Sequence, residues 1–184
     1  MAQNAPPIFD VRTFGALGDG TTDDTVAIQK AITAAEAYLS AATGRSAEVF
    51  LPRGVYIVQD ASIAWTATPI LSIAASTRRL TLRGDEAVLK LGANGCATST
   101  IRLLGSQCKI IGLTISIDYE ARFAANASWQ KVNPTGGAGD GPTGFEINTG
   151  DDNLISHCNV IGGKTTFLAT DTILQGSDCF IIVN

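Results

Sequence analysis

Apolar and polar residues alternate in more than one way along the chain, and the clearest pattern lies near the N-terminus. There, apolar side chains recur at intervals of four, three and four residues, at Ile28, Ile32, Ala35 and Leu39. This spacing places them on one face of an α-helix. A short oxygen-bearing side chain at Thr22, Asp23 or Asp24 can cap the start of the helix, and Gly44 can end it. The pattern predicts an amphipathic helix of about 18 residues that begins near Thr25.

Short extended segments flank this helix. Before it, Phe9–Phe14 is a candidate strand. After it, residues 49–58 are expected to form two short strands around a turn, because Pro52 and Gly54 interrupt an apolar run. Residues 61–76 are apolar without strong periodicity, and strands are expected there as well.

From Leu80 onward the chain carries an irregular repeat. Four segments share a glycine, two mostly polar residues, a small or Asn residue, any residue and then an aliphatic one, namely residues 84–89, 105–110, 150–155 and 176–181. Their glycines lie 21, 45 and 26 residues apart, which predicts stacked coils of about 20–26 residues with one longer excursion. A parallel β-helix explains the pattern, because equivalent positions of successive coils form ladders. Asn153 aligns with Cys108 and Cys179 and is expected to point inward.

Composition narrows the class of protein. Hydrophobic residues make up 45% of the 184-residue chain and charged residues 16%, which excludes a disordered chain. The net charge of −4 provides no basic surface for nucleic acid, and the apolar runs fall short of the ~20 residues that cross a membrane. The cysteines lack CxxC spacing and have one histidine beside them; they are Cys96, Cys108, Cys158 and Cys179. We therefore expect buried thiols, with two disulfides as the alternative in an oxidising compartment, and no metal site or cofactor.

The segment Phe14–Ile32, which reads FGALGDGTTDDTVAIQKAI, resembles the N-terminal signature of pectate-lyase-like β-helix proteins. That superfamily includes polygalacturonases, some exo-glucanases and many phage tail spikes. The resemblance implies an all-β fold, a right-handed single-stranded parallel β-helix (solenoid) with an N-terminal capping α-helix. A cap suits an open β-helix, whose end otherwise exposes unpaired strand edges and an apolar interior. The signature implies architecture and not catalysis, since its Asp residues have a helix-start role.

On this interpretation the chain divides into three parts. Residues 1–8 form an extended N-terminal lead, residues 9–79 the strand, the helix cap and the first coils, and residues 80–184 further β-helix coils. No polar closing segment follows the aliphatic run Phe180–Val183. Since a solenoid normally needs a cap at each end, the coils are expected to continue beyond residue 184 in the full protein.

Adjacent carboxylates at Asp151 and Asp152 are the first catalytic candidates, because two carboxylates can hydrolyse a glycosidic bond. The run Asn148–Asp152 faintly resembles polygalacturonase active-site motifs, but the Gly-His-Gly and Arg-Ile-Lys elements of those enzymes are missing. The repeat also aligns the two aspartates with Ser106 and Gln107, at an ordinary corner of the coil. A solvated turn is therefore the favoured interpretation of both.

The 45-residue interval contains residues 119–143, which are expected to bulge out of the stack as a long loop. Asp118 and Glu120 lie where a strand meets this loop, and they are candidate groove carboxylates or ordinary solubilising charges. Tyr119, Phe123 and Trp129 are candidates to stack on a sugar ring, or alternatively to anchor the loop to the β-helix or to lie buried at a trimer contact.

Two further groups of polar residues have both a functional and an ordinary interpretation. His157, the single histidine, fits a general base, but a surface or packed histidine is the favoured interpretation. Arg78, Arg79 and Arg83 could contact an acidic saccharide, although strand-edge charges that discourage aggregation are the more ordinary role.

The function favoured by these patterns is that of a phage tail spike or tail-fibre component. Such a protein would act as a homotrimer in the virion tail, bind and in some cases depolymerise a host surface polysaccharide, and contact other tail proteins through its N-terminus. It fits a β-helix signature that begins close to Met1 without a secretion signal. One alternative is a secreted, extracellular bacterial polysaccharide lyase or glycoside hydrolase, and another is a non-enzymatic structural or adhesive β-helix module. No nucleic-acid partner, membrane insertion or cofactor is expected with any of them.

Overall fold

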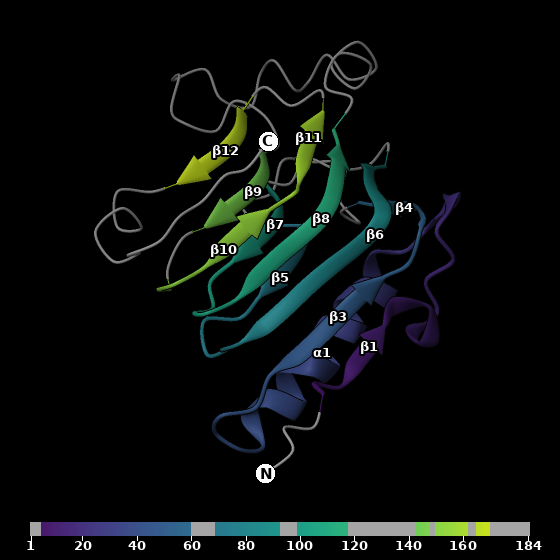
Figure 1. Cartoon of the computed structure of the whole chain (residues 1–184). Coiled ribbons are helices and arrows are strands. Elements are labelled where there is room, and N and C mark those ends of the chain that lie inside the picture. The colour runs from purple at the N-terminus through teal and green to yellow at the C-terminus, as the bar shows by residue number, and fades with distance from the viewer. Residues whose placement is uncertain are drawn as a thin grey trace.

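The computed structural model describes residues 5–59, 69–92, 99–117, 143–147, 150–161 and 165–169. Its strands form two sheets, and one α-helix, α1 (Thr25–Ser40), lies against them (Figure 1). The first sheet contains β1 (Ile8–Asp10), β2 (Asp19–Asp23), β3 (Ala47–Leu51), β4 (Gly54–Val58), β6 (Leu80–Leu91), β8 (Lys109–Ser116), β10 (Leu154–Ser156) and β11 (Asn159–Ile161). The second sheet contains β5 (Leu71–Ile73), β7 (Ser99–Leu103), β9 (Thr143–Ile147) and β12 (Thr165–Ala169). The predicted mostly-β architecture with one helix is confirmed.

All described pairings between these strands are parallel, and their registers repeat from coil to coil. On the first sheet, β6 pairs along its first half with β3 and along its second half with β4. Strand β8 pairs in the same way with β10 and β11. A coil therefore contributes two strand segments, separated by a bend, to the first sheet and one strand to the second.

The coils are longer than the sequence repeat predicts. Glu48, Thr81, Lys109 and Leu154 are successive register partners, so the coils measure 33, 28 and 45 residues. The 45-residue interval is confirmed, but the predicted 21-residue interval is wrong. Gly84 aligns with Gly112 rather than with Gly105, because Arg83 pairs with Ile111.

The misalignment has a physical cause. Gly84 lies at the bend inside the first sheet, whereas Gly105 and Gly150 lie at the corner between the second sheet and the first. At both bends a glycine precedes polar residues. The glycine is needed because two backbones approach closely there: a Cβ on Gly84 would lie 2.7 Å from the Gly112 carbonyl oxygen. One corner motif therefore does not distinguish the two. The fourth predicted segment, residues 176–181, lies outside the described residues.

The predicted inward ladder of Cys108 and Asn153 is confirmed for these two residues. Asn153 is 2% exposed; its Oδ1 accepts a hydrogen bond from the Cys108 N–H (2.9 Å), and its Nδ2 donates to the Gly105 carbonyl (2.9 Å). The amide thus satisfies two buried backbone groups of the preceding coil. Burial raises the pKa of the Cys108 thiol to about 11, so this cysteine is a protonated, unreactive core residue at neutral pH. Cys179 lies outside the described residues.

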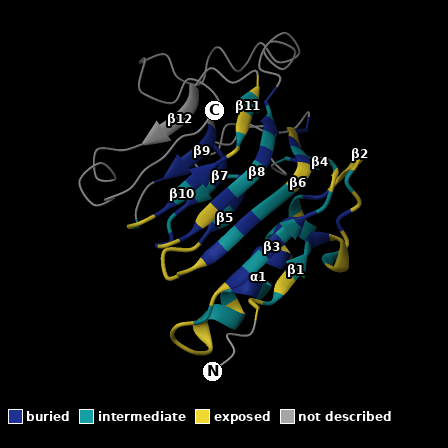
Figure 2. Cartoon of the chain, in the orientation of Figure 1, coloured by how far each residue is buried: buried dark blue, intermediate teal, exposed yellow. Residues whose placement is uncertain are grey.

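Apolar ladders fill the space between the sheets. Side chains that point inward on the first sheet stack from coil to coil and are at most 4% exposed, at Val49, Leu82, Ile110 and Ile155. Leu71, Ile101 and Phe145 form the corresponding ladder on the second sheet. Buried and less buried positions alternate along the strands (Figure 2), as expected when one face of a sheet packs on a core. Burial of each such side chain contributes about 1.5–3 kcal/mol.

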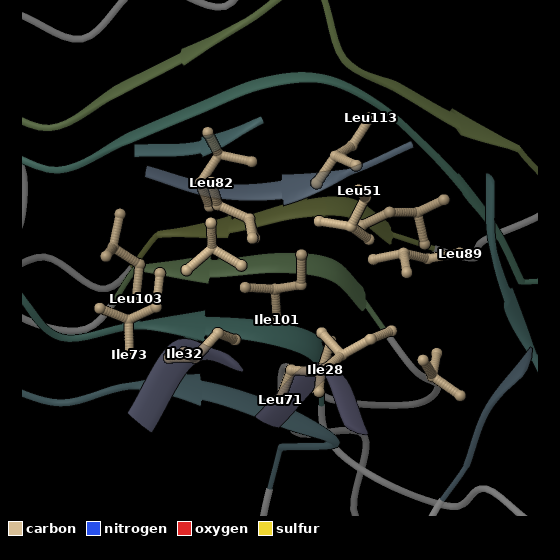
Figure 3. Packing of buried hydrophobic residues seen from close by; sticks show 14 of the residues in the cluster. Ile28, Ile32, Leu51, Leu71, Ile73, Leu82, Leu89, Ile101, Leu103 and Leu113 are labelled. Atoms are coloured by element: carbon tan, nitrogen blue, oxygen red, sulfur yellow. The ribbon is translucent and has the colours of Figure 1, made fainter. Parts of the chain in front are cut away.

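Helix α1 buries the face that the sequence predicts. Ile28, Ile32 and Ala35 are fully buried, and Leu39 at the end of the stripe is partly buried. Figure 3 shows Ile28 and Ile32 facing the side chains of β5. The helix ends at Ser40, about half a turn earlier than predicted.

The segment before the helix is only partly a strand. The prediction of a strand over Phe9–Phe14 is wrong after Asp10, because Val11–Phe14 forms a 3-10 helix, η1. The Asp10 carboxylate accepts a hydrogen bond from the Arg12 N–H (2.9 Å), which turns the backbone out of the strand. Gly15 then ends η1 in the left-handed conformation, with φ of 101°.

The predicted pair of strands around Pro52 is confirmed as β3 and β4. Both strands pair in parallel with β6 rather than with each other, so the turn between them is a bend in one coil and not a hairpin. Within residues 61–76 the structure places β5 at Leu71–Ile73, and residues 60–68 lie outside the described part of the chain.

The aspartates of the signature segment bind backbone and side-chain groups around the start of α1. Asp24 is 1% exposed, and its carboxylate accepts hydrogen bonds from the N–H groups of Leu17 (2.7 Å) and Gly18 (3.1 Å). Asp23 accepts from the N–H (3.0 Å) and hydroxyl (2.6 Å) of Thr25, the first helical residue. Asp24 is thus the N-cap residue by position, but its side chain fixes the preceding loop against the helix, and the carboxylate of Asp23 binds the first helical N–H instead.

These hydrogen bonds predict a stability that depends on pH. Bonds donated by Thr22 and Thr21 hold the pKa of Asp19 well below its ordinary value of 3.8. Burial raises the pKa of Asp23, but the bonds from Thr25 and Gln59 outweigh it and lower that pKa overall. Folding thus favours the ionised carboxylates, so their contribution is fully present well above pH 3.8 and is lost as the pH falls through the lower folded-state values.

We expect the Tm of the wild type to fall between about pH 5 and pH 2 more steeply than that of the double variant Asp19→Asn/Asp23→Asn, whose amides do not titrate. Thermal unfolding followed by circular dichroism at a series of pH values measures this. Parallel Tm curves for the two proteins would contradict the assignment.

Helix α1 also binds β5, which is the edge strand of the second sheet among the strands that the structure describes. The Gln29 amide accepts a hydrogen bond from the Ser72 N–H and donates one to the Ser72 carbonyl, each 3.0 Å long. Further along the helix, Glu36 Oε1 accepts from the Ala74 N–H (2.7 Å) and the Thr77 hydroxyl (2.8 Å). Gln29 thus gives β5 one donor and one acceptor, as a neighbouring strand would.

Candidate functional site

Asp151 and Asp152 are exposed residues at the corner between the second sheet and the first. Asp152 has a left-handed backbone (φ 57°) that Gln107 (φ 56°) and Arg79 (φ 61°) share at the equivalent positions of the two preceding coils. The Asp151 carbonyl accepts a hydrogen bond from the Gln107 N–H (2.7 Å). These positions are stacked corner positions with polar or charged residues, and a catalytic role for either aspartate stays a prediction.

His157 lies at the other bend, inside the first sheet. It is exposed, and its backbone is left-handed (φ 54°), as is that of Gly112 (φ 70°) at the aligned position of the preceding coil. Glu86 (φ 50°) lies at the same bend one coil earlier, where the register shifts and residues 84–86 lie opposite Gly112. Histidine is among the residues that enter this region of backbone space more readily. The geometry favours a surface turn residue over a general base.

The remaining residues singled out from the sequence fall into two groups. Asp118, Tyr119, Glu120, Phe123 and Trp129 lie outside the described residues, and their roles stay predictions. Arg83 lies on the outer face of β6, where it forms an ion pair with Glu48 (2.7 Å) and lies 4.2 Å from the ring centroid of Phe50. Arg83 therefore has local partners across β3 and β6.

A row of polar side chains on the outer face of the second sheet was not predicted from the sequence. Ser72, Arg102 and Glu146 are register partners on β5, β7 and β9. Because side chains alternate along a strand, these three point away from the core that Ile101 and Phe145 enter. Each of the three coils contributes one polar side chain to this row.

The centre of the row is a largely buried ion pair. Arg102 Nε lies 2.9 Å from Glu146 Oε1, and the Ser99 hydroxyl donates to Glu146 Oε2 over 2.8 Å. The side chain of Glu146 is 7% exposed and that of Arg102 is 20% exposed. Two charges at this depth have a large desolvation cost, which their mutual attraction only partly offsets. A buried pair of this kind is poor evidence for stability and is worth considering as a functional feature.

The geometry gives the two charged residues different chemical roles. Glu146 Oε1 forms an ion pair with Arg102 Nε, and Glu146 Oε2 accepts a hydrogen bond from Ser99, so Glu146 holds the guanidinium beside it. Arg102 keeps part of its side-chain surface accessible, whereas Glu146 is almost fully buried. A planar cation held in this way suits a carboxylate on a ligand. We call Ser99, Arg102 and Glu146 the outer-face cluster.

A sequence signal for the outer-face cluster exists, but it is weak. Each charged residue stands between two apolar residues of a strand, in Ile101-Arg102-Leu103 and in Phe145-Glu146-Ile147. Their pairing depends on a register between residues 44 positions apart, which the sequence repeat did not fix. Within the described part of the chain, no group of three or more His, Cys, Asp or Glu side chains is arranged to hold a metal ion. The one described helix is too short and too polar to cross a bilayer.

The similarity of the chain to known proteins extends beyond the signature segment. Residues 8–177 match the family model described as rhamnogalacturonase A/epimerase, pectate lyase-like. The chain belongs to this family. The match begins with β1 and includes every described strand and the helix, so the relationship predicted from Phe14–Ile32 is confirmed over almost the whole chain.

Curated proteins similar to this chain include mannuronan C5-epimerases. Mannuronan C5-epimerase AlgE6 of Azotobacter vinelandii is 38% identical over 109 residues, which are 59% of this chain and 10% of the epimerase. The structure of the AlgE6 A-module aligns with 96% of this chain and 41% of the module, at a TM-score of 0.63 and 23% identity. The matched residues thus cover a tenth of the length of AlgE6, and the structural alignment covers about two fifths of its A-module.

Two further structures share the fold at lower similarity. ORF18 of Geobacillus virus E2 aligns with 82% of this chain and 26% of its own, with a TM-score of 0.50 and 23% identity. The family 28 exopolygalacturonase of Yersinia enterocolitica aligns with 97% of this chain and 42% of its own, with a TM-score of 0.52 and 15% identity. At these identities the likeness establishes the fold alone.

Proposed function

We propose that residues 9–79 form the capped end, and residues 80–184 further coils, of a right-handed parallel β-helix. The parallel registers support a stack of coils, and the bonds from Gln29 and Glu36 to the edge of β5 support a capping role for α1. Helix α1 occupies, in the first coil, the place beside β5 that a strand of the second sheet would otherwise take. The arrangement covers apolar side chains and strand edges together.

We further propose that the protein binds and modifies an acidic polysaccharide through the outer face of the second sheet. The observation that carries this proposal is the Arg102–Glu146 ion pair, which presents a fixed guanidinium on the outside of a β-helix in a family of carbohydrate-active enzymes. A uronate carboxylate would bind such a cation with two parallel hydrogen bonds. The similarity to a mannuronan epimerase supports an acidic substrate over a neutral one.

The chemistry of a uronate would give Arg102 a role beyond binding. Both elimination and epimerisation begin with removal of the ring proton next to the carboxylate, which places negative charge on that group. A fixed cation beside the carboxylate stabilises the charge as it develops. Arg102 would supply this stabilisation, and Glu146 and Ser99 would keep its position.

We propose first that this protein is located in the tail of a phage virion. As a tail spike or tail-fibre component it would form a homotrimer, contact other tail proteins and bind a host surface polysaccharide. The likeness to ORF18 of Geobacillus virus E2 supports this setting. Light scattering of the full-length gene product tests it: a trimer supports the proposal, and a monomer secreted after cleavage of a leader contradicts it.

A secreted polysaccharide enzyme is the second candidate, which the similarity to AlgE6 and to the exopolygalacturonase favours. Incubation with a panel of acidic and neutral polysaccharides, followed by reducing-end assays and proton NMR, separates the reaction types. New reducing ends indicate hydrolysis, unsaturated ends indicate elimination, and altered ring-proton couplings without new ends indicate epimerisation. Unchanged polymers throughout, with no binding, would contradict a carbohydrate function.

A further inference from the structure

A polar cavity lies at the corner that joins the second sheet to the first, beside the C-terminal end of α1. Its volume is about 340 Å³, within the range of small-molecule sites. Three arginines from different parts of the coil line it, namely Arg45, Arg78 and Arg79. The cavity is distinct from the outer-face cluster on β7 and β9, because none of the residues of that cluster lines it.

Two of the guanidinium groups are held in place by the protein. Arg45 lies 4.6 Å from the ring centroid of Tyr38, and its Nη1 donates to the Tyr38 carbonyl over 3.1 Å. Arg79 donates from Nε to Gln107 Oε1 and from Nη1 to the Gly44 carbonyl, each over 3.3 Å. A guanidinium has five N–H donors, so each keeps donors for a ligand.

The charge of the cavity is positive in a protein whose net charge is −4. Among its described lining residues, Glu36 carries the one carboxylate, and Glu36 Oε1 already accepts from Ala74 and Thr77. The C-terminal end of α1 adds a partial negative charge. Asp151 and Asp152 follow at the same corner one coil further along and do not line the cavity.

We propose that this cavity binds a single carboxylated sugar unit. Arg78 and Arg79 would bind the carboxylate, because planar guanidinium groups match it. Hydroxyl groups that also line the cavity would bind the ring hydroxyls of the sugar, from Ser40, Thr43 and Ser76. The inference rests on the proposed function for the sugar nature of the ligand, whereas its anionic character follows from the cavity itself.

Backbone amide NMR of the full chain, titrated with sodium glucuronate, tests the inference. We expect saturable shifts at Gly44, Arg79 and Gln107 and none with glucose. Arg78→Gln should bind glucuronate about tenfold more weakly, because it removes a charge-assisted interaction. Arg53→Gln is the matched control: Arg53 is an exposed arginine at the other bend, paired with Glu86, and its replacement should leave the affinity unchanged.

The outcomes separate this inference from the proposed function. Glucuronate shifts that persist in a protein that binds no polysaccharide would support the cavity and contradict the function of the outer-face cluster. Shifts of the same size with inorganic phosphate would overturn a carboxylated sugar as the ligand. Absence of saturable shifts in a folded wild type, or equal affinity in Arg78→Gln, would overturn the site altogether.

Discussion

Replacing Asp24 by asparagine is expected to lower the free energy of unfolding by about 3 kcal/mol. The two oxygens of the Asp24 carboxylate accept hydrogen bonds from the N–H groups of Leu17 and Gly18 in a nearly fully buried position. An asparagine keeps the shape but presents an NH₂ group to one of these donors. One backbone N–H then stays buried without an acceptor, and the charge-assisted bonds are lost.

Asp23→Asn is the matched control, because it makes the same chemical change one residue earlier. Asp23 is exposed, and its amide counterpart still has an oxygen for Thr25. We expect this variant to lose less than about 1 kcal/mol. Urea denaturation of both variants measures the difference. Equal losses would show that burial of the Asp24 carboxylate is not what holds the loop against α1.

The second large effect is expected for Gly150→Ala, which should cost at least about 3 kcal/mol. Gly150 has φ of 99°, which disfavours any side chain, and a Cβ there would collide with the Gly105 carbonyl oxygen of the preceding coil. The Gly105 carbonyl also accepts the Asn153 amide bond. The substitution therefore disturbs both the close approach of two coils and the hydrogen bond between them.

Gly15→Ala separates the two causes. Gly15 has nearly the same φ, 101°, but no atom lies within 4 Å of its would-be Cβ. It should lose only the backbone strain, about 1–2 kcal/mol. A difference between the two variants in urea denaturation reports the coil contact, and similar losses would contradict the stacking of Gly150 on Gly105.

The sequence predicted the features that depend on residues close together in the chain. The 3.6-residue period locates α1 and its buried face, and the Pro52–Gly54 break locates the bend between β3 and β4. The 45-residue interval was correct because Asn153 and Cys108 occupy the same corner and carry the same flanking pattern. In each of these cases the local sequence pattern is compatible with one local structure.

What escaped prediction depends on contacts between coils. Gly84 was misaligned because two bends of one coil use the same residue types, and only the register of β6 with β8 tells them apart. The Arg102–Glu146 pair requires the register of β7 with β9 across the 45-residue interval. The 3-10 helix η1 replaces a strand because Asp10 accepts local hydrogen bonds from the Arg12 N–H and the Thr13 hydroxyl, which turn the backbone.

The most direct test of the proposed function is electrophoresis of the protein through gels that contain polymannuronate or neutral dextran. We predict retardation by polymannuronate alone, and its loss in Arg102→Gln. The double variant Arg102→Gln/Glu146→Gln keeps a neutral pair at the buried position, so it should fold, as far-UV circular dichroism will report, and still fail to bind. Arg53→Gln should migrate like the wild type. Equal migration of the wild type in the two gels, or wild-type retardation of the double variant, would contradict a polysaccharide site at Arg102.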